Sequence, residues 1–118
     1  MQTKDAVQAL VALGQDSRLA IFRFLVEAGP DGAFAGRIAE ALGIPPALIS
    51  FHVKGLCHAG LIDSERDGSD GRLIRYTANF AVVKELIAYL TKNCCGGQPE
   101  LCAEECVPAV KAPTRKRA

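Results

Sequence analysis

A glycine and two prolines in the middle of the chain constrain its fold more than any other feature. Apolar residues at helical spacing predict a short helix at about 35–42, which Gly43 ends because glycine permits a tight turn. Pro45 and Pro46 then open a second helix at about 46–59, since proline suits the first helical turn, where its missing N–H would have no partner. The middle of the chain is therefore predicted to be two short helices joined by a tight turn.

A β-hairpin is predicted directly after this pair of helices. Segments 61–67 and 72–78 mix apolar and polar residues with partial alternation, and the Gly/Asp-rich sequence between them indicates a turn. Helical spacing predicts further helices at about 4–13, 16–29 and 80–93. A helix-turn-helix pair followed by a hairpin is the winged helix-turn-helix arrangement, in which the second helix of the pair enters the DNA major groove. We therefore expect a mainly α fold with a small β-hairpin.

The length and charge of the chain restrict its class. Its 118 residues suit one domain and are too few for a two-domain enzyme with a cleft between lobes. No apolar run approaches the roughly 18 residues of a membrane span, and charged residues interrupt the N-terminal segment. We therefore expect a cytoplasmic protein without a membrane partner. The last residues, 107–118, carry four bases and no acid, which predicts a basic, disordered tail.

Polar and basic side chains on the second helix of the pair and on the hairpin are the candidate DNA contacts. Helix positions can reach base edges and phosphates, and hairpin arginines can meet phosphates or the adjacent minor groove. The candidates are Ser50, His52, Lys54, Arg66, Arg72 and Arg75. His52 has apolar neighbours, so a packed and hydrogen-bonded role competes with the contact that we favour. Double-stranded DNA is the partner that this set predicts.

The sequence LGIPPALISFHVKGLCHAGLI at 42–62 resembles the helix-turn-helix core of the ArsR/SmtB family of metal-responsive repressors, and GRLIRYTANF at 71–80 resembles the family's wing end. The resemblance covers about 16–97 and departs from the family where Pro45, Pro46 and Leu48 replace residues that are often polar. It implies a repressor that forms a homodimer through its first and last helices. Such a dimer binds an inverted-repeat operator, with the two recognition helices about one turn, or ~34 Å, apart.

Four of the five cysteines fall within thirteen residues near the end of the chain. Clustered cysteines in such a chain indicate metal or redox chemistry rather than disulfides, and soft thiolates favour soft ions. Adjacent cysteines at a helix end, with a third a few residues later, resemble the arsenite-responsive members of the family. The resemblance implies that trivalent arsenic or antimony is the inducer that releases the operator. The implied ligands are Cys94, Cys95 and Cys102, with Cys106 as a spare or substitute.

Other effector sites of this family are incomplete here. Phe34 and Gly36 occupy the positions of one cysteine pair, the helix at 80–93 lacks the Asp and His of a zinc site, and the second helix of the chain lacks the cysteine of a redox pair. Four cysteines still permit tetrahedral zinc. Cys57 with the C-terminal cysteines permits cadmium or lead, although Leu61 stands where that branch has its second cysteine. We interpret Cys57 as a small buried hydrophobe.

A thiol oxidoreductase is the alternative from a different class. Cys94 and Cys95 do not form a C-x-x-C on a strand–helix turn, and a chain dominated by a helix-turn-helix leaves no substrate pocket, so we expect no enzyme. A zinc-, cadmium-, lead- or thiol-redox-responsive repressor of the same fold stays open. The expected organisation is a DNA-binding and dimerisation domain at 1–93, a cysteine-rich inducer-binding segment at 94–106 and the basic tail at 107–118.

Overall fold

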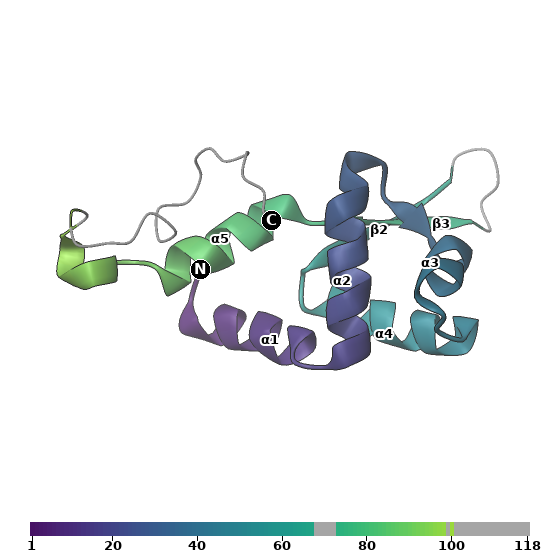
Figure 1. The fold of residues 1–118 in the computed structure, drawn as a ribbon, viewed down its shortest axis with the longest axis horizontal. Coiled ribbons are helices and arrows are strands. Elements are labelled where there is room, and N and C mark those ends of the chain that lie inside the picture. Colours follow the sequence, from purple (N-terminus) through teal and green to yellow (C-terminus); the bar gives the residue numbers. More distant parts are fainter. Residues whose placement is uncertain (68–72, 99, 101–118) are drawn as a thin grey trace.

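The computed structural model describes residues 1–67, 73–98 and 100, which form a winged helix-turn-helix fold (Figure 1). The helices are α1 (Thr3–Leu13), α2 (Asp16–Ala28), α3 (Ala35–Leu42), α4 (Pro46–His58) and α5 (Phe80–Leu90), with the short 3-10 helices η1 (Gly29–Asp31) and η2 (Cys94–Gly97). The strands are β1 (Ala33–Phe34), β2 (Ile62–Arg66) and β3 (Ile74–Ala78). The predicted mainly α fold with a small β-hairpin is confirmed. The tail at 107–118 lies outside the described residues, and no helix among those described is long and apolar enough to cross a membrane.

Local sequence determines the unit formed by α3, the turn and α4. Gly43 adopts a left-handed conformation with φ 67° and ψ 31°, and its N–H donates to the carbonyl oxygen of Ala39 at 2.9 Å. Pro46 is the first residue of α4, and the carbonyl oxygen of Pro45 accepts from the N–H of Leu48 at 2.9 Å. The glycine and the prolines therefore act as predicted, because Gly43 permits the left-handed turn and the proline ring fixes φ at the start of α4.

Three antiparallel strands form the sheet in the order β1-β3-β2. The hairpin pairs from Ile62 opposite Ala78 to Arg66 opposite Ile74. Strand β1, Ala33–Phe34, has only two residues, too few to show an alternating pattern, so a prediction from periodicity misses it. Because β1 leads directly into α3, its pairing with β3 connects the wing to the start of the helix-turn-helix unit.

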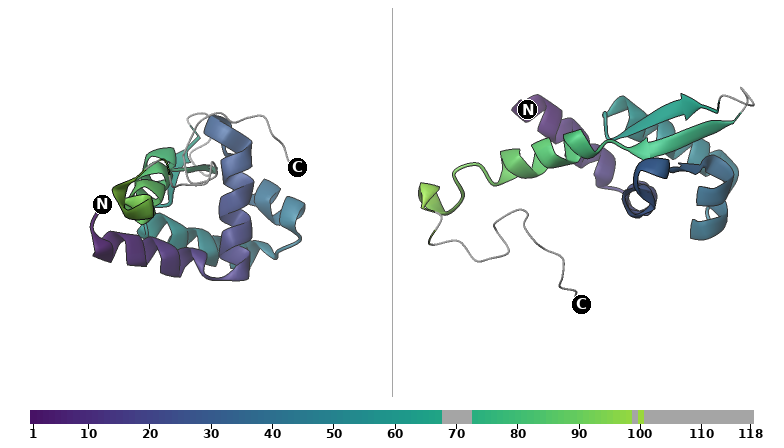
Figure 2. Two further views of the ribbon diagram at one scale, coloured as in Figure 1. Left: turned by 60° about the vertical axis from the view of Figure 1, so that its left-hand side comes forward. Right: turned by 90° about the horizontal axis from the view of Figure 1, so that it is seen from above.

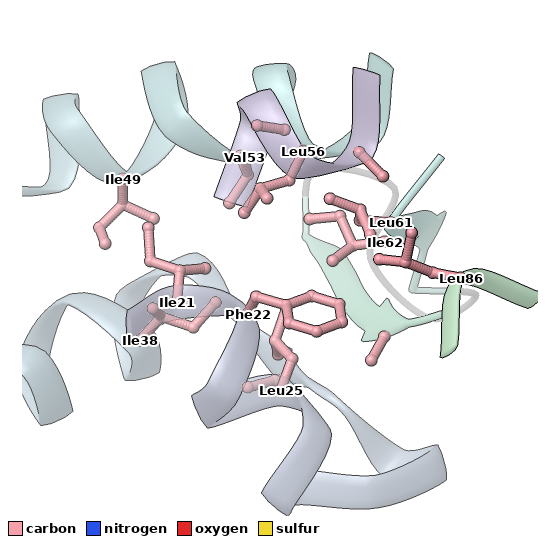
Figure 3. Close-up of a cluster of buried hydrophobic side chains, with 14 of the residues drawn as sticks. Ile21, Phe22, Leu25, Ile38, Ile49, Val53, Leu56, Leu61, Ile62 and Leu86 are labelled. Carbon is pink, nitrogen blue, oxygen red and sulfur yellow. The ribbon is translucent and has the colours of Figure 1, made fainter. Parts of the chain in front are cut away.

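The core lies where α2 packs against α4 and the sheet (Figure 3). Ile21 and Leu25 of α2 are fully buried, as are Ile49 and Leu56 of α4. Figure 3 shows Ile21 and Ile49 pointing toward one another from these two helices. Burying one such side chain is worth about 1.5–3 kcal/mol. This packing therefore determines which face of α4 turns inward and which remains for function.

Helix α1 buries its alanines rather than its larger apolar residues. Ala6, Ala9 and Ala12 are buried, whereas Val7 and Val11 are more than half exposed. Small side chains allow two helices to approach closely, which explains why the alanines face the core. The larger apolar residues of α1 are left on the molecular surface.

Helix α5 extends away from the core (Figure 2) and ends earlier than the predicted residue 93. Leu86 is the only buried residue within α5, while Val82, Val83 and Tyr89 are partly buried against the core. It ends at Leu90, where the hydroxyl of Thr91 donates to the carbonyl oxygen of Ile87 at 2.8 Å. Asn93 then turns the chain with a left-handed φ of 58°.

Gly32 provides a test of the connection between the wing and α3. Its φ is 62° and its ψ is −153°, and a Cβ at this position would clash with the carbonyl oxygen of Tyr76. We expect Gly32→Ala to lower the free energy of unfolding in urea by about 2–3 kcal/mol, because the substitution adds backbone strain and a steric clash.

Gly36→Ala is the matched control. Gly36 lies in α3, and an added Cβ would have no atom within 4 Å, so this substitution should leave stability unchanged or slightly higher. Equal effects of the two substitutions would show that the close approach of Gly32 to β3 does not limit stability.

Candidate nucleic-acid interface and thiol pair

The outward face of α4 presents two of the predicted DNA contacts. Ile49, Val53 and Leu56 are buried, and their spacing defines the inner face of the helix. Ser50 and Lys54 lie on the opposite side and are exposed. A hydroxyl and an ammonium group are therefore available to a duplex laid along this face.

His52 is not placed at the surface, which corrects the predicted DNA contact. Its side chain is only 8% exposed, and its Nδ1 has no hydrogen-bond partner within the described part of the chain. Its ring meets the ring of Phe51 edge-on, with centroids 5.4 Å apart. His52 follows Ile49 by three residues, so it lies on the same buried face of α4. The prediction counted only apolar residues on that face and therefore missed His52.

The predicted arginines of the wing have different environments. Arg66 ends β2 and is exposed, so its position agrees with an approach to phosphates. Arg75 is half-buried on β3, where it lies opposite Phe34 of β1 on one side and Glu65 of β2 on the other. Arg72 lies outside the described residues. Of the two described arginines, Arg66 is the more exposed.

Cys94 and Cys95 lie together in η2, directly after α5. Adjacent residues of a regular helix diverge by about 100°, but Cys95 takes a left-handed conformation with φ 58° and ψ 36°. The two sulfur atoms are consequently 3.7 Å apart. Two thiolates that bind one tetrahedral zinc at about 2.3 Å are separated by about 3.8 Å, so this spacing fits two ligands of a single ion.

The remaining predicted ligands lie beyond this pair. Cys102 and Cys106 fall outside the described residues. Within 1–67, 73–98 and 100, no group of three or more His, Cys, Asp or Glu side chains is placed to hold a metal ion. The described structure therefore brings together two of the four predicted thiol ligands, Cys94 and Cys95.

Cys57 occupies a packed position at the end of α4, as its interpretation as a small hydrophobe predicts. Its side chain contacts the core cluster and is half-buried. Burial raises the pKa of this thiol above its ordinary value of 9.0; a hydrogen bond with Ser64 lowers the pKa in part, and the charge of Asp63 raises it further. Burial also raises the pKa of Tyr76, and the nearby Cys57 adds to that shift.

Alkylation of Cys57 tests this environment. A variant with serine at the four C-terminal cysteines leaves Cys57 as the single thiol. Because only the thiolate reacts and the folded pKa is raised, we expect slow reaction with N-ethylmaleimide at pH 7.5 and a rate that rises with a midpoint above pH 9.0. The urea-unfolded variant is the control and should react faster at pH 7.5. A folded midpoint at or below that of the unfolded chain would contradict the assignment.

Comparison with known proteins identifies the fold. Residues 13–65 match a family of helix-turn-helix domains. Among curated proteins there is no match. An ArsR-like transcriptional regulator from Rhodococcus sp. RHA1 has a similar structure, with a TM-score of 0.68 and 24% identity over 83% of this chain and 87% of that one.

Two further similar structures are a homodimer and a DNA complex. The homodimeric winged helix-turn-helix DNA-binding domain of a possible ArsR-family regulator from Mycobacterium bovis has a TM-score of 0.56 and 22% identity, over 75% of this chain and 83% of that one. The MepR–DNA complex of S. aureus has a TM-score of 0.57 and 21% identity, over 79% of this chain and 78% of that one. The chain therefore has the winged helix-turn-helix fold of ArsR-like transcriptional regulators, and these neighbours are regulators or DNA-binding domains, not enzymes.

Proposed function

We propose that this protein is a homodimeric transcriptional repressor that binds double-stranded operator DNA in the cytoplasm. In this proposal, trivalent arsenic or antimony binds the C-terminal cysteines and releases the operator. The observation that carries the DNA-binding part is the outward face of α4, where Ser50 and Lys54 are exposed beside the arginine-bearing wing. The arsenic-binding part is supported by the paired thiols of Cys94 and Cys95.

The fold supports α4 as the recognition helix. It is the second helix of the helix-turn-helix pair, and that helix enters the major groove in proteins with this motif. Arg66, at the end of β2, then lies on the wing that would flank the same site. The similar S. aureus structure was determined as a DNA complex, which adds to the case for this mode of binding.

Exposed apolar residues support a dimer through α1 and α5. Val7, Leu10 and Val11 on α1, with Ile87 and Leu90 on α5, are large apolar side chains exposed in a single chain. The two helices also meet within one chain, where the hydroxyl groups of Thr3 on α1 and Tyr89 on α5 lie 2.5 Å apart. A second copy against these helices would bury this apolar surface, and two-fold symmetry would then require an inverted-repeat operator.

The thiol pair supports a soft-ion inducer. Thiolates prefer soft ions, and a separation of 3.7 Å allows Cys94 and Cys95 to bind the same one. Trivalent arsenic carries a lone pair and takes three thiolates in a pyramid, so Cys102 would complete the site, with Cys106 as a spare or substitute. Because η2 follows α5, inducer binding would act on a helix of the proposed dimer interface. Thermodynamic linkage requires that DNA weaken inducer binding by the same factor.

Lys54→Ala tests the α4 face. The duplex would be selected by the wild-type protein from a random-sequence library, and we expect the Lys54 variant to bind it more weakly than the wild type does. If each protomer loses one phosphate contact, the slope of log affinity against log salt should fall by about 1.8 for the dimer. Arg23→Ala is the charge-matched control: this exposed residue of α2 pairs with Glu27 at 3.0 Å and should leave the slope unchanged. An unaltered slope for the Lys54 variant, measured by fluorescence anisotropy, would remove Lys54 from the interface.

Cys95→Ser tests the inducer site. In the reduced wild-type protein, arsenite should lower the affinity for the selected duplex by about tenfold or more, within the usual range of allosteric coupling. The Cys95 variant should bind DNA normally and lose this response, because it lacks one of the two thiols that η2 holds 3.7 Å apart. Cys57→Ser is the control and should respond as the wild type does.

Other effectors separate the alternatives. Antimonite, zinc, cadmium and a thiol oxidant would each be added to the same reduced protein–DNA complex. Release by zinc or cadmium with arsenite inert would favour the metal-responsive alternative, and release by the oxidant alone would favour the redox one. Loss of DNA binding in Cys95→Ser without any effector would show that this residue has a structural role.

A further inference from the structure

The outward face of α4 presents a large apolar side chain that the core does not use. Phe51 is 66% exposed and the neighbouring Leu48 is 48% exposed. Ile49 and Val53 bury the opposite face of the helix, so Phe51 projects from the outer side, where one edge of its ring meets His52 and the rest is exposed. Helix α4 lies at the lower right of the molecule in Figure 1.

The neighbours of Phe51 leave space around its ring and add a charge beside it. Helical spacing places Ala47 one turn before Phe51 and Gly55 one turn after it, and neither has a long side chain. Neither residue adds bulk next to the ring; Gly55 itself lies near the side chain of Arg18, whose Cδ would be 3.8 Å from an added Cβ. Lys54, three residues later, is exposed on the same side.

An exposed aromatic ring beside a lysine is complementary to the DNA major groove. The groove is flanked by phosphates, which Lys54 can approach, and its floor presents the edges of the bases. Thymine alone among the four bases adds an apolar group to that floor, its 5-methyl group. Phe51 has no hydrogen-bonding group, so placing its ring against the polar edge of another base would leave donors or acceptors unpaired.

We propose that Phe51 is a specificity-determining residue that contacts thymine 5-methyl groups in the major groove of each operator half-site. This inference rests on the proposed function, because it requires α4 to be the recognition helix. It adds a base preference that the polar side chains of α4 do not specify. The operator is thus expected to contain a thymine at the position facing the middle of α4 in each half.

Replacing thymine by deoxyuridine tests the proposal directly. Deoxyuridine lacks the methyl group and keeps the same hydrogen-bonding edge. The full-length reduced protein would be titrated with its selected duplex and with duplexes that carry deoxyuridine at one thymine position at a time, either in one half-site or in both. Loss of a buried methyl group should lower affinity about fourfold in one half-site and about fifteenfold when both halves are changed. The effect should be confined to the thymines facing α4.

Phe51→Ala then assigns this preference to the ring. The variant should bind the thymine duplex more weakly and should bind the thymine and deoxyuridine duplexes equally. Leu19→Ala is the matched control, because Leu19 is a 46% exposed apolar residue on α2, and it should keep the wild-type ratio. Circular dichroism and light scattering of each variant would report its fold and oligomeric state.

The outcomes separate this inference from the function on which it rests. Failure of the wild-type protein to select any duplex would contradict the proposed function itself. A selected duplex with no deoxyuridine effect, or with the same effect in the wild type and in Phe51→Ala, would overturn the role of Phe51 alone. A change of oligomeric state in Phe51→Ala would also overturn it, because the ring would then belong to an interface between copies.

Discussion

The packing of α4 against α2 is the interaction on which the rest of the structure depends. Ile49 and Leu56 are completely buried in this contact, together with Ile21 of α2. A helix can turn only one face inward, so this burial fixes the residues that face a partner. Ser50 and Phe51 are exposed for this reason, and any change in the rotation of α4 would move both of them away from a bound duplex.

Much of this arrangement could be predicted from local sequence, because single residues fix the backbone where elements join. Gly43 and Pro46 set the turn and the start of α4, and the predicted helix boundaries there agree with the structure to within one residue. Contacts between distant segments could not be predicted in this way. The alanines of α1 are buried in place of Val7 and Val11 because the fit between helices, rather than side-chain size, decides which face lies inside. Strand β1 depends entirely on its pairing with β3.

In the candidate sites, too, some features follow from local sequence and others do not. The exposure of Lys54 follows from helix periodicity, and the burial of His52 would follow too if its three-residue offset from Ile49 were counted with the apolar stripe. The nearness of the thiols was harder to predict. Two glycines after Cys95 indicate a helix end, but only the left-handed backbone of Cys95 itself brings its sulfur toward that of Cys94. A non-glycine residue in this region of φ and ψ is uncommon, and sequence pattern alone does not reveal it.

The contrast between α4 and α5 suggests how a thiol site could control DNA binding without disturbing the core. Helix α4 is held by four buried residues, whereas α5 buries only Leu86. An element with so few buried contacts can move at much lower free-energy cost than one embedded in the core. In the proposed dimer, α5 would contact the partner chain through Ile87 and Leu90, so a small movement of α5 would alter the spacing of the two recognition helices. A hundredfold loss of DNA affinity requires only about 2.8 kcal/mol of difference in inducer binding between the two arrangements, which lies within the usual range of allosteric coupling. The core can therefore stay rigid, and the recognition face of α4 intact, while the distance between two such faces changes.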